Sequence, residues 1–153
     1  MSIEQRGDAE GSLQVDNAGV VDLFCGAGGL SHGFRLEGFA VGAGIDIDEA
    51  CRYPYEQNNG GRFIKEDVGK LSAEFLQGLF RPVRNRVLVG CAPCQPFSTY
   101  NQKNTDPKWK LVDKFTDLAL ELQPEIVSME NVPQLLKFQD GKVFNDLVRR
   151  LRK

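Results

Sequence analysis

Short apolar runs alternate with longer amphipathic stretches along the chain from residue 19 onward. The runs are rich in Val, Ile and Leu and are bounded by Gly, Pro or charged residues, which is the pattern of strands buried in a parallel sheet. We therefore predict strands at residues 19–24, 39–45, 62–65, 86–90 and 125–129.

The stretches between these runs predict helices, because their apolar residues recur at helical spacing. Asp48 is placed to cap a helix that follows the second strand, although Pro54 must interrupt or bend that helix. The other predicted helices are residues 29–36, 71–80, 109–122 and 143–151.

Strands that alternate with helices indicate an α/β fold with a parallel sheet and right-handed crossovers. The 153 residues are 41% hydrophobic and 26% charged, which suits one domain with a core of its own. Residues 1–18 are polar and do not read as a secretory signal, so we expect a disordered leader there. No apolar run approaches the roughly 20 residues that a membrane span needs.

Four cysteines occur in this chain, and no secretory signal accompanies them. A reducing compartment is therefore expected: the cytoplasm, the nucleoid, or the nucleus if the source is a eukaryote. The net charge of −2 and the pI near 5.5 are unusual for a dedicated nucleic-acid binder. Any contact with DNA must be local or be made by another chain or segment.

A glycine-rich turn follows the first strand, in the stretch D-L-F-C-G-A-G-G of residues 22–29. Its glycines let the backbone approach a ligand closely, but their spacing fits a pyrophosphate poorly. Asp46 and Asp67 close the next two strands, where carboxylates can accept hydrogen bonds from a ribose and an adenine amine. These residues suggest a nucleoside cofactor; simple caps and turns remain an equal alternative.

Two cysteines, Cys91 and Cys94, follow the fourth strand in the stretch G-C-A-P-C-Q-P-F-S. The position of the pair after a fourth strand disfavours a redox pair. A zinc site is disfavoured because the single histidine, His32, is remote in sequence. A single nucleophile at Cys94, with Cys91 as packing at the strand end, fits best. Glu130 ends the fifth strand and should reach the same edge of the sheet.

The stretches D-L-F-C-G-A-G-G-L-S, G-I-D-I-D, E-D-V, G-C-A-P-C-Q-P-F-S and M-E-N-V occur in this order. In these motifs residues 19–153 resemble the N-terminal part of the catalytic domain of DNA (cytosine-5)-methyltransferases, enzymes of DNA methylation and restriction–modification. The resemblance implies a Rossmann-like methyltransferase fold and S-adenosylmethionine as cofactor. The cofactor-binding residues that it implies are Phe24, Gly26, Ala27, Gly29, Leu30, Asp46, Ile47, Asp67, Val68 and Pro93.

The same resemblance implies that Cys94 and Glu130 are catalytic. Cys94 would attack C6 of a cytosine flipped out of double-stranded DNA, while Glu130 would hold N3 and the exocyclic amine. The loop of residues 92–108 would close over the DNA. In and just beyond this loop, we expect contacts with DNA phosphates from Gln102, Lys103, Lys108 and Lys110. The alternative is that these side chains form an ordinary solvated surface.

The chain departs from the family pattern after its last helix. It lacks a Gln-x-Arg-x-Arg segment, a target-recognition region and the late motif that completes the cofactor domain. The sheet should stop after about five strands and leave residues 125–129 as an exposed edge. We therefore expect that methyl transfer requires a complementing C-terminal segment or chain; the alternative is an inactive remnant that binds cofactor or a partner without turnover.

Overall fold

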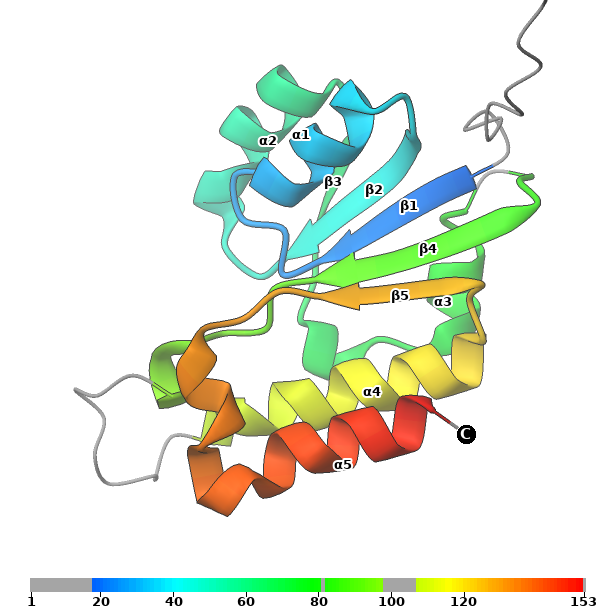
Figure 1. The fold of residues 1–153 in the computed structure, drawn as a ribbon. Helices are drawn as coiled ribbons and strands as arrows, with labels where there is room; N and C mark the ends of the chain where they lie inside the picture. Colours follow the sequence, from blue (N-terminus) through cyan, green and yellow to red (C-terminus); the bar gives the residue numbers. More distant parts are fainter. Residues whose placement is uncertain (1–17, 81, 98–106, 153) are drawn as a thin grey trace, which may run out of the picture.

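The computed structural model describes residues 18–80, 82–97 and 107–152. Its centre is a five-stranded parallel sheet with the order β3-β2-β1-β4-β5 (Figure 1). All five predicted strands are confirmed. Their bounds are β1 (Ala18–Leu23), β2 (Ala40–Asp46), β3 (Arg62–Lys65), β4 (Asn85–Gly90) and β5 (Ile126–Met129).

Helices cover the two faces of the sheet unequally (Figure 1). α1 (Gly29–Leu36) and α2 (Arg52–Asn59) lie on one face, and α3 (Ala73–Gln77), α4 (Lys110–Leu122) and α5 (Lys142–Leu151) lie on the other. Among the described residues no helix is both long and apolar enough to cross a membrane. Short 3₁₀ helices occur at Glu49–Cys51, Val68–Lys70, Gln95–Phe97, Pro107–Trp109, Pro133–Leu136 and Phe138–Gly141.

Two helix predictions need correction. α3 is shorter than the predicted 71–80, because the Ser72 side chain accepts a hydrogen bond from Phe75 N and begins the helix there, and Gly78 ends it. Pro54 does not interrupt α2, because it lies in the first turn, where its missing N–H would have no helical partner. Asp48 caps the preceding 3₁₀ turn, as predicted, by accepting from Ala50 N.

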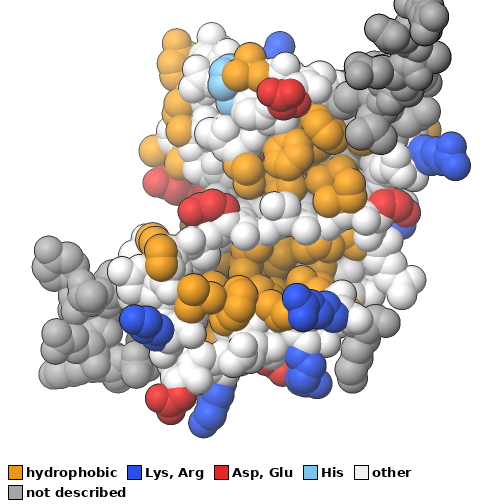
Figure 2. Space-filling view, in the orientation of Figure 1, with side chains coloured by type: hydrophobic (Ala, Val, Ile, Leu, Met, Phe, Trp, Pro, Cys, Tyr) orange, Lys and Arg blue, Asp and Glu red, His pale blue; other side chains and the backbone are white. Residues whose placement is uncertain are grey.

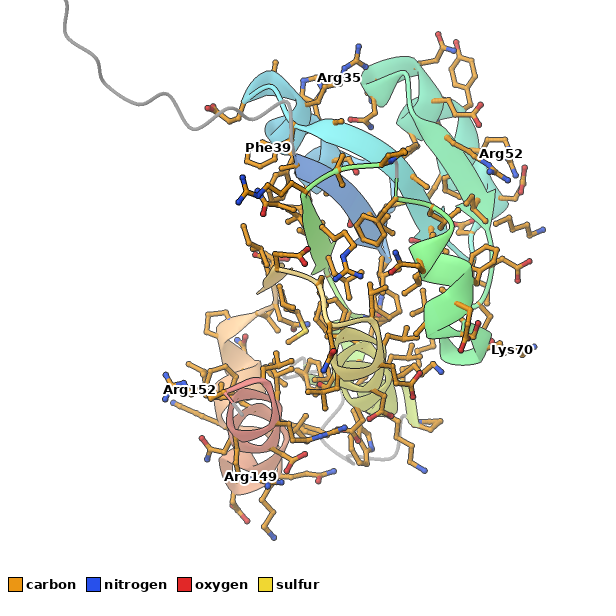
Figure 3. The ribbon with its side chains drawn as sticks, turned by 90° about the vertical axis from the view of Figure 1, so that its right-hand side faces the viewer. Arg35, Phe39, Arg52, Lys70, Arg149 and Arg152 are labelled. Atoms are coloured by element: carbon orange, nitrogen blue, oxygen red, sulfur yellow. The ribbon has the colours of Figure 1, made fainter. Side chains whose placement is uncertain are left out.

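The main core lies between the sheet and the α3–α4 layer. Phe115 and Leu118 of α4 and Leu76 of α3 are fully buried against Val21 and Leu88. α5 packs beside α4, and both are seen nearly end-on in Figure 3. Arg149 and Arg152 at the end of α5 project outward in that view, whereas Arg150 pairs with Asp117 of α4.

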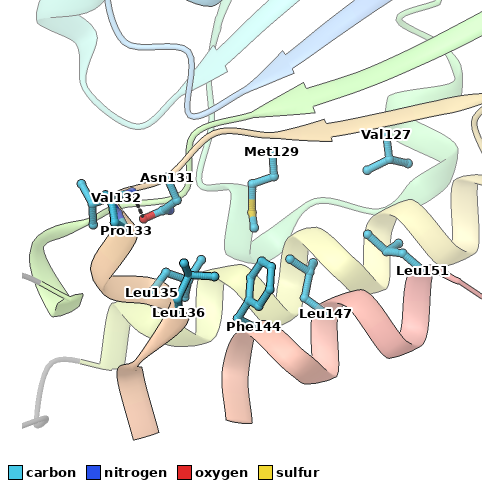
Figure 4. Close-up of a pocket in the computed structure, with 10 residues that line it drawn as sticks. All are labelled: Val127, Met129, Asn131, Val132, Pro133, Leu135, Leu136, Phe144, Leu147 and Leu151. Atoms are coloured by element: carbon cyan, nitrogen blue, oxygen red, sulfur yellow. Dashed lines mark hydrogen bonds between the residues drawn. The ribbon is translucent and has the colours of Figure 1, made fainter. Parts of the chain in front are cut away.

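β5 is an edge strand in the described part of the chain, as expected, and Ile126 on it is 50% exposed. An apolar groove of about 350 Å³ runs between β5 and α5, and Figure 4 shows Met129 facing Phe144 across it. Figure 2 shows hydrophobic side chains gathered on the part of the surface where β5 and α5 lie. We call this feature the β5–α5 groove. Its lining is Val127, Met129, Asn131, Val132, Pro133, Leu135, Leu136, Phe144, Leu147 and Leu151.

Candidate active site

The predicted site residues follow the carboxyl ends of the five strands, where α/β sheets bind ligands. The strand register explains why they meet. Leu23, the last residue of β1, lies level with Ile45 of β2 and with Gly90 of β4. Gly90 in turn lies level with Met129, the last residue of β5. The side chains that come next in each strand therefore share one edge of the sheet.

The turn after β1 is held in an unusual backbone conformation. Phe24 has a φ of 59°, and Gly26 and Gly28 have φ values of 51° and 88°. A non-glycine residue at positive φ costs of order 1 kcal/mol and is typical of functional sites. Gly28 must be glycine, because a Cβ there would lie 2.1 Å from Nδ2 of Asn59. The strained turn thus places Phe24 at the edge of the sheet.

Asp46 holds this turn from the end of β2. Its Oδ2 accepts a hydrogen bond from Gly26 N at 2.9 Å, and its Oδ1 accepts one from Asp48 N at 2.9 Å. The carboxylate is therefore fixed in direction before any ligand arrives. Asp67 also caps the 3₁₀ helix Val68–Lys70, since its Oδ1 accepts a hydrogen bond from Gly69 N at 2.9 Å.

A cavity of about 630 Å³ opens beside these carboxylates; we call it the acidic cavity. It brings together seven of the twelve predicted site residues. Ile47 on its wall is 64% exposed, which leaves an apolar surface available to a flat ring. The lining is Phe24, Asp46, Ile47, Asp48, Asp67, Val68, Cys91, Ala92, Pro93, Cys94, Gln95, Lys108 and Leu111.

A second cavity of about 380 Å³ shares Phe24 and Cys91 with the first; we call it the Glu130 cavity. Leu30 and Glu130, two more of the predicted residues, line it together with Asp22 and Cys25. The structure therefore places Cys94 and Glu130 in cavities that share part of their walls.

Three predicted residues lie outside these two linings. Ala27 and Gly29 line a separate shallow hollow with His32, and Gly26 takes part only through its hydrogen bond to Asp46. Gln102 and Lys103 lie outside the described residues, as does the expected leader apart from Ala18, which begins β1. In the described part of the chain, no three His, Cys, Asp or Glu side chains converge as metal ligands.

Cys91 differs from its expected role as packing at the strand end. Its Sγ donates a hydrogen bond of 2.8 Å to Oε2 of Glu130. Two further bonds join the same segments: Glu130 N donates to Gly90 O at 3.0 Å, and Nδ2 of Asn131 donates to Ala92 O at 2.9 Å. The thiol contact was missed because Cys91 and Glu130 are far apart in sequence, and only the β4–β5 pairing brings them together.

Burial alters the proton affinity of several groups around the site. Burial raises the pKa of Cys91 to about 12, and the Glu130 hydrogen bond and charge act in the same direction. Burial also raises the pKa of Cys25, with further contributions from Asp22 and Asp46. Both thiols are therefore protonated at neutral pH and poorly suited to act as nucleophiles. The pKa of Asp22 is raised to about 6, mainly by burial.

Comparison with known proteins decides the family of the chain. The family model for C-5 cytosine-specific DNA methylases matches residues 18–153. The chain belongs to this family.

Among relatives of this methylase chain, the type II methylase M.HgiDII of Herpetosiphon aurantiacus is 50% identical over 86% of the chain and 38% of its own length. Type II methyltransferase M.AgeI of Thalassovita gelatinovora is 32% identical over 85% of the chain and 31% of its own length. The chain thus spans less than half the length of these relatives.

Solved structures share the fold of the methylase chain. A prophage-encoded E. coli protein, named as a DNA modification methyltransferase, aligns with a TM-score of 0.72 and 30% identity over 88% of the chain and 38% of its own. The S. pombe Dnmt2 methyltransferase aligns with a TM-score of 0.63 and 18% identity, over 86% of the chain and 39% of its own. These matches confirm the predicted Rossmann-like methyltransferase fold.

Proposed function

We propose that this methylase chain carries the cofactor-binding and catalytic part of an enzyme that methylates C5 of cytosine in DNA. The observation that carries the proposal is the pair of adjoining cavities. The acidic cavity holds Cys94, the Glu130 cavity holds Glu130, and Phe24 and Cys91 line both. A nucleophile and a carboxylate beside a nucleoside-shaped pocket suit transfer from a cofactor to a base.

S-adenosylmethionine fits the acidic cavity, whose volume lies in the usual range for small-ligand sites. Asp46 is held by two backbone N–H groups, so its carboxylate is oriented to accept bonds from ribose hydroxyls. The exposed Ile47 side chain offers the adenine an apolar surface, and Asp67 and Val68 would hold the edge of the ring. Pro93 would close the pocket near Cys94. When bound, the cofactor supplies the methyl group.

Cys94 would then act on a cytosine flipped out of the DNA duplex, because the base cannot be reached inside the stack. The thiolate forms a bond to C6, and the electron pair of the C5–C6 double bond makes C5 nucleophilic. Glu130 would hold N3 and its proton as charge builds there. After C5 has taken the methyl group, a base removes the C5 proton, the double bond re-forms and the Cys94 sulfur leaves.

Further polypeptide, either a continuation or a second chain, would complete the enzyme at the edge of the sheet. An unpaired edge strand offers free backbone groups, and the β5–α5 groove beside it is lined by side chains such as Met129, Phe144 and Leu147. Because the relatives are much longer than this chain, we propose that a C-terminal segment of theirs has its counterpart at this edge. That segment would supply contacts to DNA bases.

Cofactor binding tests the first half of the proposal. Calorimetry on this chain should detect S-adenosylmethionine bound one to one, and Asp46→Ala should weaken the Kd at least tenfold, because it removes the ribose acceptor and the anchor of Gly26. Glu66→Gln, an exposed carboxylate just beyond β3, is the matched control. Equal affinities in the wild type and Asp46→Ala would contradict the assignment.

Covalent trapping tests the second half. The chain is mixed with S-adenosylmethionine, with the C-terminal part of M.HgiDII, its 50% identical relative, and with duplex DNA containing 5-fluorocytosine. Fluorine at C5 cannot leave as a proton does, so the Cys94–C6 bond should persist through denaturation. Cys94→Ser should abolish the adduct and Cys51→Ser should not. Cofactor binding without any adduct would instead favour a remnant that binds without turnover.

A further inference from the structure

Cys91 stands where the two cavities of the site meet. It is the first residue after β4, lines both the acidic cavity and the Glu130 cavity, and is only half buried. Its backbone N–H donates to Leu23 O at 3.2 Å, which fixes the residue against the end of β1. From this fixed position its thiol donates to Oε2 of Glu130 at 2.8 Å.

We propose that Cys91 is a positioning residue whose thiol holds the Glu130 carboxylate in the direction of the base. The inference rests on the function proposed above, in which Glu130 meets the cytosine. It gives the first cysteine of the Cys-x-x-Cys sequence a task of its own, distinct from that of the nucleophile Cys94.

Glu130 needs such a partner because its side chain is exposed and can rotate about three bonds. Its backbone is already fixed, since Glu130 N donates to Gly90 O. The neighbouring Asn131 is tied to Ala92 O by its side chain. The thiol hydrogen bond extends this fixed arrangement to the carboxylate itself.

A thiol also suits the chemistry better than a cation would. A Lys or Arg partner would favour the ionised carboxylate and oppose a proton shared between Glu130 and N3. A thiol is a weak, neutral donor, so it orients the group without adding positive charge. Burial and the nearby Glu130, Cys94 and Asp22 keep the pKa of Cys91 high, at about 12, so the donor proton is present throughout the neutral range.

The pairing can be tested on this chain without any turnover. Alkylation of each cysteine by iodoacetamide at pH 8.5 is followed by mass spectrometry in the wild type and in Glu130→Gln. Removing the carboxylate charge should raise the alkylation rate of Cys91 about fivefold or more, because its thiolate forms more readily. Cys51, which ends the 3₁₀ helix between β2 and α2, should be unchanged. An unchanged Cys91 rate would overturn the pairing.

The positioning role predicts an order of activities in the complemented protein. Cys91→Ser keeps a donor and should retain kcat within about threefold, whereas Cys91→Ala should lose about tenfold with the KM for cofactor unchanged. A residue that only packs would show the reverse order, because alanine is the better apolar substitute. If the complemented wild type makes no adduct, the proposed function fails, while the alkylation result still decides the pairing.

Discussion

Replacing Asp22 with Asn should change how the stability of this chain depends on pH. Asp22 lies at the end of central strand β1, is 1% exposed and has no cationic partner among the described residues. Its Oδ2 accepts a hydrogen bond of 2.7 Å from Oγ of Ser31. The hydroxyl group of Tyr55 lies 3.0 Å from the same Ser31 oxygen, so the three side chains form one buried network beneath the glycine turn.

The magnitude follows from the shift in the pKa of Asp22 between the unfolded and folded states. Burial raises this pKa from 3.8 to about 6, against the opposing effect of the Ser31 hydrogen bonds. The folded state therefore holds a proton that the unfolded state has lost between these two values. Since each pH unit of such a difference corresponds to about 1.4 kcal/mol, ionisation of Asp22 costs the folded state about 3 kcal/mol. This stabilisation is complete below about pH 4 and is lost as the pH rises through 6.

Urea unfolding at pH values from 4 to 8 measures this effect. The free energy of unfolding of Asp22→Asn, relative to the wild type, should rise by about 3 kcal/mol between pH 4 and pH 7, because the amide still accepts from Ser31 but does not ionise. Asp140→Asn, a change at an exposed carboxylate with a φ of 58° that asparagine tolerates, is the control and should follow the wild type. A constant difference between Asp22→Asn and the wild type across this range would refute the reasoning.

Two further predictions concern stability elsewhere in the fold. Gly28→Ala should lower the free energy of unfolding by about 3 kcal/mol or more in urea denaturation, because the added Cβ would meet Asn59 and the residue has a positive φ. At Gly33, within α1, an added Cβ would have nothing within 4 Å, so Gly33→Ala should raise the free energy of unfolding by about 0.5–1 kcal/mol. Arg86 lowers the pKa of Glu125 to about 2, so this pair stabilises the fold above about pH 4.5 and less as the pH falls toward 2. Because Glu125 is 40% exposed, Glu125→Gln should cost less than about 1 kcal/mol at pH 7 and still less at pH 2, as measured by thermal unfolding.

The sequence predicts the elements of this fold well because local signals mark their ends. Most strands are apolar runs that stop at a glycine or a charge, and the sheet edge where the runs end follows from parallel pairing. The predicted 71–80 helix was too long because its apolar pattern continues past Gly78, whereas the helix does not. Apolar residues are buried both within a helix and just beyond its end. The apolar pattern alone therefore does not locate the cap.

Side-chain directions at the site could not be predicted in this way. Cys91 and Glu130 were both expected at one sheet edge, but whether a thiol points into the core or across to the neighbouring strand depends on how β4 and β5 twist and pair. A small apolar side chain after a strand gives no such signal. The positive φ of Phe24 was equally hidden, because only the neighbouring glycines suggested an unusual backbone there.

The strand order separates the residues to which the proposed function gives different tasks. From β1 the chain proceeds outward to β2 and β3 on one side, then returns and proceeds to β4 and β5 on the other. Asp46 ends β2 and Asp67 follows β3, whereas Cys94 follows β4 and Glu130 follows β5. Phe24, which follows the central strand, lines both cavities. In the proposed reaction the methyl group would therefore be transferred close to the strained Phe24 turn.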